Sequence, residues 1–204
     1  IESCTSIHTV SIGEGSFTHY HSLSLKHCGH LREFRRDKMS FPSLRSIEMR
    51  SIGLVSFEIG HSEFTHLESL VMDGLSGLNI LRIGKGNGVK DIENGRFDIT
   101  NCGMISSLVI EEGSFKFFGE VRIEKNVGLR EMEFGPWCFN RAHDVRFIGR
   151  MKDGFEVGLS ALEGITMGDN AFLGDHRDHR KTIPTYPYNY NNRLIMEGRC
   201  GVKG

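Results

Sequence analysis

Histidine and cysteine are the residues of this 204-residue chain whose spacing could support metal or thiol chemistry. Four histidines lie close together, as His19-x-His21 and His27-x-x-His30, and imidazole is a common zinc ligand. The segment between His21 and His27 has the alternation of a single strand, so these two side chains are expected at its opposite ends. They would not converge on one ion, and we predict no metal site here.

The five cysteines do not form a recognisable framework. Their number is odd, their spacing is irregular, and no C-x-x-C pair occurs, which argues against a disulfide scaffold or a zinc finger. Cys4, Cys28 and Cys102 share one inward phase of the repeat described below, and we expect them to be reduced and buried, because a buried cysteine behaves as a small hydrophobe. Cys138 follows Trp137 at a turn and is a candidate for exposure, with no activating base beside it.

The known catalytic and phosphate-binding motifs are absent from the sequence. Gly84-Lys85-Gly86-Asn87-Gly88 is glycine-rich, but a phosphate loop needs G-K-S/T at the start of a helix. Neither G-x-S-x-G nor H-E-x-x-H occurs, and His176 and His179 lie in a segment of mixed charge that is typical of a polar loop. We therefore predict a non-enzymatic protein with no cofactor.

A repeated hexapeptide defines the elements that would position these residues. Except in the copy that starts at Arg36, the hexapeptide begins with the last residue of an apolar triplet. Two apolar residues at i and i+2 follow six and eight residues after its last position in five copies, whereas the fourth pair comes three residues later than this and the seventh sixteen residues later. The fourth copy has Gly88 where the others have Phe. The copies are Ile12-Gly13-Glu14-Gly15-Ser16-Phe17, Arg36-Asp37-Lys38-Met39-Ser40-Phe41, Ile59-Gly60-His61-Ser62-Glu63-Phe64, Ile83-Gly84-Lys85-Gly86-Asn87-Gly88, Ile110-Glu111-Glu112-Gly113-Ser114-Phe115, Phe134-Gly135-Pro136-Trp137-Cys138-Phe139 and Met167-Gly168-Asp169-Asn170-Ala171-Phe172.

Each pair predicts a short, half-buried strand, because apolar residues two apart point to the same face. The pairs are Leu23 and Leu25, Ile47 and Met49, Leu70 and Met72, Phe97 and Ile99, Val121 and Ile123, Val145 and Phe147, and, after an insertion, Leu194 and Met196. Stacked in parallel, these strands make one sheet, and the apolar triplets predict shorter strands on an opposite wall. The glycine that follows the triplet in five of the seven units is expected at a corner with positive φ. Little helix is expected.

The line Leu67-x-x-Leu70-x-Met72-x-x-Leu75-x-x-Leu78 resembles the leucine-rich repeat pattern. The hexapeptide, I-G-x-x-S/A-F, resembles the short subclass found in bacterial surface antigens and protist proteins. The resemblance covers nearly the whole chain. We predict a β-rich solenoid, a right-handed leucine-rich-repeat superhelix of about seven units of about 23–24 residues, with parallel short strands.

A single domain over residues 1–204 is predicted, with insertions at 149–161 and 173–192. Both ends cut the repeat without a capping segment, which favours a fragment of a longer array or a subunit packed in a larger assembly. The net charge of −1 gives no basis for binding nucleic acid, and no apolar run is long enough to span a membrane. The sequence does not define the compartment, although the odd cysteine count and the lack of a sequon or signal peptide favour an intracellular one.

The outward face of the main sheet remains as the candidate functional surface, since extended solenoid faces commonly bind proteins. We expect it to recognise a protein partner, and the insertion at 173–192 to supply tyrosine contacts. The proposed partner-binding residues are Glu48, Arg50, Asp73, Asp98, Arg122, Arg146, Tyr186 and Tyr188. The alternative is a structural subunit that contacts neighbouring subunits through its ends and the 173–192 loop.

Overall fold

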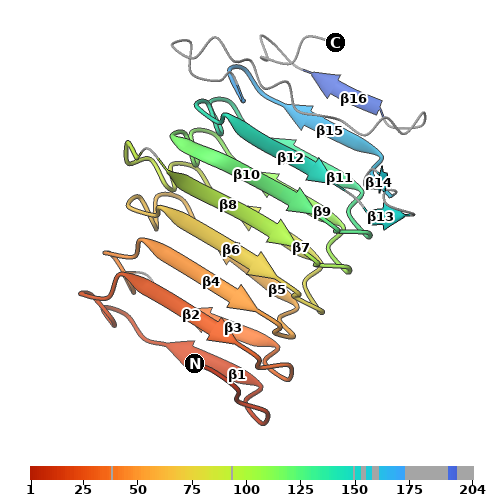
Figure 1. Ribbon diagram of the computed structural model, residues 1–204. Coiled ribbons are helices and arrows are strands. Elements are labelled where there is room, and N and C mark those ends of the chain that lie inside the picture. The colour runs from red at the N-terminus through yellow and green to blue at the C-terminus, as the bar shows by residue number, and fades with distance from the viewer. Residues whose placement is uncertain are drawn as a thin grey trace.

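The computed structural model describes residues 1–37, 39–92, 94–148, 150–152, 155–157, 161–172 and 193–196. Over these residues the chain is a parallel-strand β-solenoid of about six turns, and none of them is helical (Figure 1). The turns stack from the red N-terminal end to the blue end of the picture, and each contributes one strand to each of two walls. The predicted β-rich solenoid is confirmed.

The principal sheet, as we call the first wall, contains six parallel strands in the order β12-β10-β8-β6-β4-β2. Their bounds are β2 (Ser22–Lys26), β4 (Ser46–Arg50), β6 (Ser69–Asp73), β8 (Gly95–Thr100), β10 (Phe118–Glu124) and β12 (Asp144–Ile148). The predicted apolar pairs point inward: in β6, for example, Leu70 and Met72 are fully buried while the residues between and beside them are half-buried. The sequence alternation therefore translates directly into the two faces of this sheet.

The second sheet, on the opposite wall, has the order β16-β15-β11-β9-β7-β5. Its strands are β5 (Ser56–Ile59), β7 (Ile80–Ile83), β9 (Ser107–Ile110), β11 (Glu131–Phe134), β15 (Gly164–Met167) and β16 (Arg193–Met196). Leu194 and Met196 were predicted to continue the principal sheet, and this is wrong: in β16 they pair with Ile165 and Met167 of β15. Alternating apolar residues occur in the strands of both walls and do not distinguish them. Only the regular spacing of the repeat assigns a strand to one wall, and the insertions interrupt that spacing.

Two small sheets complete the fold. β1 (Thr9–Ile12) and β3 (Glu33–Arg36) pair in parallel and lie in the same phase as the second sheet. β13 (Arg150–Lys152) and β14 (Phe155–Val157) form an antiparallel hairpin within the predicted insertion at 149–161. The insertion at 173–192 lies outside the described residues.

We define the corners as the turns that lead from a strand of the second wall into the next strand of the principal sheet. They contain the phenylalanines of the hexapeptide. Their rings stack in two groups. Phe115, Phe139 and Phe172 stack at centroid distances of 5.5 and 5.2 Å, and Phe17 stacks on Phe41 at 5.0 Å. Between the groups Gly88 replaces a ring, and a Cβ at this position would lie 2.7 Å from the Phe115 ring and 2.9 Å from the Phe118 ring.

The glycine at the second position of the hexapeptide serves close packing between turns. The expectation of positive φ at this position is wrong, because none of these glycines has it. Instead a Cβ on Gly135 would lie 2.5 Å from the Glu112 nitrogen, and one on Gly168 would lie 2.5 Å from the Pro136 nitrogen. The backbone of one turn therefore packs directly on the backbone of the previous turn, and no side chain fits between them.

Positive φ occurs instead at the sixth position in every copy except that of Phe64, and at the fourth position of all copies, which we call the turn slot. Its φ lies between +53° and +71° in every copy, and the occupants are Gly15, Met39, Ser62, Gly86, Gly113, Trp137 and Asn170. The backbone hydrogen bonding is regular across the middle copies: the N–H of the turn-slot residue donates to the carbonyl oxygen at the third position of the next copy, at 2.7 to 3.2 Å, in Ser62, Gly86, Gly113 and Trp137. Glycine meets this requirement with least strain.

The second wall is interrupted between β3 and β5, although the principal sheet is continuous beside it. Arg36 occupies the inward position that holds an aliphatic or aromatic residue in the other turns, and its side chain is only 9% exposed. Its guanidinium donates to the Glu58 carbonyl oxygen at 3.0 Å, pairs with the Glu63 carboxylate and lies 4.7 Å from the centre of the Phe64 ring. The Arg36 side chain thus donates to a backbone carbonyl oxygen on the edge of β5 that faces β3, so this acceptor is not used for strand pairing.

The predicted burial of several side chains also needs correction. Phe17 is 46% exposed, because the first corner has a neighbouring ring on one side only. Cys4, which precedes the first full turn, is half-buried, whereas Cys28 and Cys102 are fully buried as predicted. Cys138, a candidate for exposure, is fully buried, and its Sγ lies 3.1 Å from the Glu111 carbonyl oxygen.

Candidate functional site

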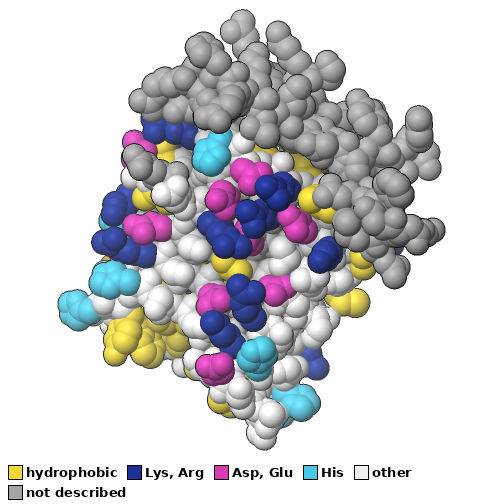
Figure 2. Space-filling view, in the orientation of Figure 1, with side chains coloured by type: hydrophobic (Ala, Val, Ile, Leu, Met, Phe, Trp, Pro, Cys, Tyr) yellow, Lys and Arg dark blue, Asp and Glu magenta, His cyan; other side chains and the backbone are white. Residues whose placement is uncertain are grey.

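The outer face of the principal sheet gathers most of the charged side chains seen in Figure 2, in two groups with a hydrophobic side chain between them. The first group, the lower cluster, spans β2, β4 and β6. Lys26 Nζ lies 2.6 Å from Glu48 Oε2, Arg50 Nε donates to Glu48 Oε1 at 2.6 Å, and Arg50 Nη1 donates to Asp73 Oδ2 at 3.0 Å. Charges of alternating sign therefore bridge three adjacent strands.

Hydrogen bonding shifts the ionisation of this lower cluster. The bonds from Arg50 and Lys26 lower the pKa of the Glu48 carboxyl, and the bond to Glu48 raises the pKa of Arg50. For Asp73, burial favours the neutral acid, but hydrogen bonds from Asn101, Thr100 and Arg50 outweigh it, so the pKa is lowered. Glu48, Arg50 and Asp73 are thus ionised at neutral pH.

The second group, the upper cluster, spans β8, β10 and β12. Arg122 lies 3.4 Å from Glu120 and 3.9 Å from Asp144, while Arg146 Nε donates to the other Asp144 oxygen at 2.9 Å. Arg122 and Arg146 are direct register partners on β10 and β12, which confirms the prediction that they lie on successive strands. The Arg146 side chain is 50% exposed, so its guanidinium faces solvent beside that of Arg122.

Asp98 does not belong to the accessible part of this face, contrary to the prediction. The residue is 3% exposed, because Arg96 folds over it and donates through Nε to Oδ2 at 2.6 Å. Its Oδ1 is buried with no hydrogen-bond partner, as is Nε of Arg122, its register partner. Asp98 therefore supports Arg96 and cannot itself contact a partner in this arrangement.

The predicted site residues consequently fall into three groups. Glu48, Arg50 and Asp73 are brought together in the lower cluster, and Arg122 and Arg146 in the upper one. Tyr186 and Tyr188 lie outside the described residues. The prediction omitted Lys26 and Arg96, although their positions beside the buried pairs could have revealed both, because each extends a column of outward residues.

Val71 separates the two clusters. It pairs in register with Glu48 of β4 on one side and with Asp98 of β8 on the other, and it is half-buried. An apolar position flanked by ionised clusters is a common arrangement in recognition surfaces, where a partner side chain is desolvated inside a polar rim.

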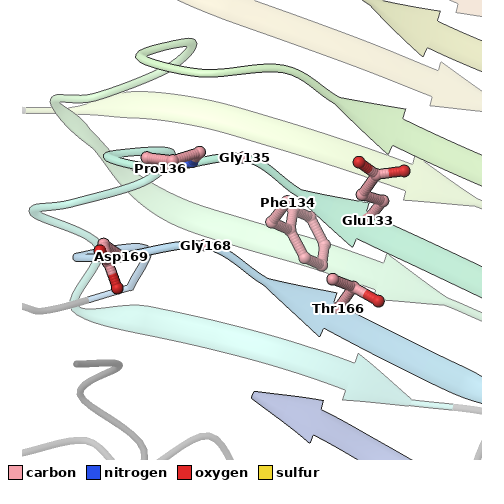
Figure 3. Close-up of a pocket in the computed structure, with 7 residues that line it drawn as sticks. All are labelled: Glu133, Phe134, Gly135, Pro136, Thr166, Gly168 and Asp169. Atoms are coloured by element: carbon pink, nitrogen blue, oxygen red, sulfur yellow. The ribbon is translucent and has the colours of Figure 1, made fainter. Parts of the chain in front are cut away.

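A groove of about 340 Å³ lies on the opposite side, at the ends of β11 and β15 (Figure 3). Its lining includes Glu133 and Thr166 from the strands and Pro136 and Asp169 from the corners. Figure 3 shows Glu133 and Asp169 at opposite ends of the groove, so their carboxylates do not form a paired acid and base. The shape alone therefore supports no catalytic role.

Thiol and metal chemistry find little support in the described residues. Burial raises the pKa of the Cys102 thiol to about 11 and that of Cys138 to about 12, which keeps both protonated and unreactive at neutral pH. His21 and His27 flank opposite ends of β2. Within the ranges that the structure covers, no three His, Cys, Asp or Glu side chains are grouped as metal ligands, and no helix is long and apolar enough to cross a membrane.

The chain matched no known protein in three comparisons, made with protein-family models, with curated proteins and with solved structures. Its function therefore has to be inferred from the surface itself.

Proposed function

We propose that the chain is a non-enzymatic scaffold of the leucine-rich-repeat type, wound as a right-handed superhelix, that binds another protein through the outer face of its principal sheet. The observation that best supports this is the side-by-side placement of Arg122 and Arg146 in the upper cluster. Two adjacent guanidiniums repel each other, and the carboxylates of Glu120, beside Arg122, and of Asp144, between the two, offset this repulsion. A carboxylate from a partner could replace one of these contacts and bind in a bidentate manner.

The arrangement of the whole face fits a protein better than a small ligand. The sheet surface is an extended array of ion pairs on both sides of Val71. The ion pairs are half-exposed, and such pairs contribute only about 0–1 kcal/mol each to folding. Their dense alternation is therefore more useful for partner choice and association rate than for stability.

The test is the double charge reversal Arg122→Glu with Arg146→Glu. Binding to the physiological partner, first identified by affinity capture and mass spectrometry, should weaken at least about tenfold, which corresponds to about 1.4 kcal/mol. Folding should change little, because both arginines lie on the outer face of the sheet, with side chains that are 31% and 50% exposed. The matched control is Arg82→Glu with Arg130→Glu, two exposed arginines on the second wall, each paired with one glutamate.

Equal binding by the folded double mutant and the control would contradict the proposal. It would favour the alternative, a structural subunit that contacts its neighbours through its ends and the 173–192 segment. One observation supports that alternative: within the described residues β12 pairs with β10 only, whereas the second sheet continues past this level to β15 and β16. Concentration-dependent self-association of the purified chain would then be expected.

A further inference from the structure

Trp137 is the only tryptophan of the chain and occupies a turn slot, where its φ is +64°. Positive φ in a bulky residue is a strained conformation. Three other copies use glycine here, and a Cβ on Gly15 or Gly113 would meet nothing within 4 Å, so the slot projects its side chain away from the core. In keeping with this, Trp137 is 42% exposed.

The fold does not require the indole. The structural role of the slot is its backbone: the N–H of Trp137 donates to the Asp169 carbonyl oxygen at 2.9 Å, as Gly113 does to Pro136 at 2.8 Å. The residue thus combines backbone strain with an exposed aromatic ring and gives nothing to the core that glycine would not. A strained, exposed residue with no structural benefit indicates a functional role.

The neighbours of Trp137 make the corner a small cation–aromatic platform. Lys116 Nζ lies 5.1 Å from the centre of the Trp137 ring and 5.5 Å from that of the Phe117 ring, and the Arg141 guanidinium lies 4.6 Å from the centre of the Phe117 ring. Both Lys116 and Phe117 are half-buried. We call these four residues the Trp137 platform. It lies at the corner side, where the principal strands begin, and not on the outer face of the principal sheet (Figure 1).

The charges of this platform are unequally satisfied. Arg141 Nη1 is 3.0 Å from Asp91, and the nearby Lys85 is 3.1 Å from Glu112. Lys116 has no carboxylate within ion-pair distance among the described residues. Its ammonium is held between two rings, which favours a fixed position and leaves it available to one external anion.

We propose that the Trp137 platform binds an acidic peptide segment of a protein partner, with one carboxylate on Lys116 and an apolar side chain against the indole. Tryptophan and arginine are the residue types most enriched where binding energy concentrates. A nucleic acid is less favoured, because it needs several cations for successive phosphates, and here Arg141 and Lys85 already have carboxylate partners. The platform and the sheet face are separate surfaces, so either can fail without the other.

Intrinsic fluorescence provides a direct test, because all the indole emission comes from Trp137. The intact chain is titrated with a capped acidic pentapeptide, Glu-Glu-Leu-Asp-Glu, with its neutral counterpart, Gln-Gln-Leu-Asn-Gln, and with a short oligouridylate. The acidic peptide should shift the emission to shorter wavelength in a saturable manner. Salt at about 0.5 M, where the electrostatic screening length is only about 4–5 Å, should weaken this effect. Lys116→Gln, which removes the charge and keeps the first two methylene groups of the side chain, should weaken binding at least about fivefold.

A response to the neutral peptide equal to that of the acidic one, or no response to either, would overturn the proposal. Tighter binding of the oligouridylate would overturn it in favour of a nucleic-acid site.

The melting temperatures of variants distinguish a binding role of Trp137 from a structural role. Trp137→Gly should raise the melting temperature by about 2–4 °C, because it removes the strain of the turn slot, and should abolish calorimetric binding of the acidic peptide. Met39→Gly is the matched control, because Met39 occupies the turn slot of another copy with φ +60° and is 68% exposed. It should also raise the melting temperature but leave peptide binding unchanged. A lower melting temperature for Trp137→Gly would mean that the indole is structural.

Discussion

The principal sheet and the second wall are built from the same repeat, yet one is continuous over six strands and the other is broken between β3 and β5. Charged residues are abundant on the continuous sheet, as in the lower cluster of Lys26, Glu48, Arg50 and Asp73, but all lie on its outer face. The second wall has one charge, that of Arg36, at an inward position. The second wall is thus broken beside the one strand whose inward position carries a charge, whereas the charges on the outer face of the principal sheet coexist with continuous pairing.

The break has a compensating partner. Glu63 stands where the other copies have a small or uncharged residue, and its carboxylate accepts from Arg36 and, at 2.7 Å, from the Gly60 N–H. In the four following copies, the corresponding second-position N–H donates to the preceding strand, as Gly84 does to Ile59 at 2.7 Å. Two departures from the repeat in successive turns thus satisfy each other and replace a ladder hydrogen bond.

The largest effect should come from the core that both walls share. Phe139→Ala is expected to cost about 3–5 kcal/mol of unfolding free energy, because the fully buried ring contacts Phe97 of the principal sheet and Phe134 of the second. Chemical denaturation measures it. Phe17→Ala, at the exposed first corner, is the control and should cost less than about 1 kcal/mol. Similar losses for both would show that the difference between inner and terminal corners is wrong.

An intermediate effect is expected at the break. Arg36→Ala should cost about 2–3 kcal/mol, below the range for a fully buried pair, because the Glu63 side chain is 28% exposed. Arg36→Ile with Glu63→Ser restores the usual residue types of the repeat and should recover at least the wild-type stability. Amide hydrogen exchange of β5 should then slow as β3 pairs with it. A double mutant as unstable as Arg36→Ala would show that the ion pair does not cause the break.

The smallest effect concerns pH. Burial favours the neutral form of Glu63, but hydrogen bonds from Arg36 and Gly60 outweigh it and lower its pKa, as Arg50 and Lys26 do for Glu48. A carboxyl with a lowered pKa in the folded state contributes stability at neutral pH that is lost as the pH falls below about 4.5. Glu63→Gln should therefore flatten the acid limb of the stability curve.

Glu48→Gln should flatten it less, and its effect should decrease in 1 M salt, because the outer pair is more exposed to screening. Equal, salt-insensitive effects at the two sites would remove the distinction between an inner and an outer pair.

Much of the fold could be predicted from the sequence, because its signals are local and periodic. The pairs Val121 with Ile123 and Val145 with Phe147 fix both the strands β10 and β12 and the register that places Arg122 beside Arg146. The assignment failed where the phase was lost: Leu194 and Met196 have the alternation of either wall and joined the second.

The candidate site was less predictable, because burial on an outer face depends on side-chain conformation. Asp98 has the phase of an exposed residue, yet Arg96 covers it. Cys138 follows an exposed tryptophan, yet it fills the inward fifth position of the hexapeptide, which also buries Ser114 and Ala171. The sequence did contain a signal for the break, since Arg36 is the one charged residue at the first position of the hexapeptide, but its meaning depends on Glu63 in the next copy.

The division of the corner rings into two stacks has a consequence for how the array comes apart. In a solenoid each turn is coupled only to its neighbours, so a boundary with weaker coupling separates cooperative blocks. The ring stack and the second-wall ladder both lapse next to the third copy, between Phe41 and Phe115 and between β3 and β5. A pulling force applied along the axis should therefore meet two blocks of unequal strength, and the first two turns should detach as a unit before the rest yields.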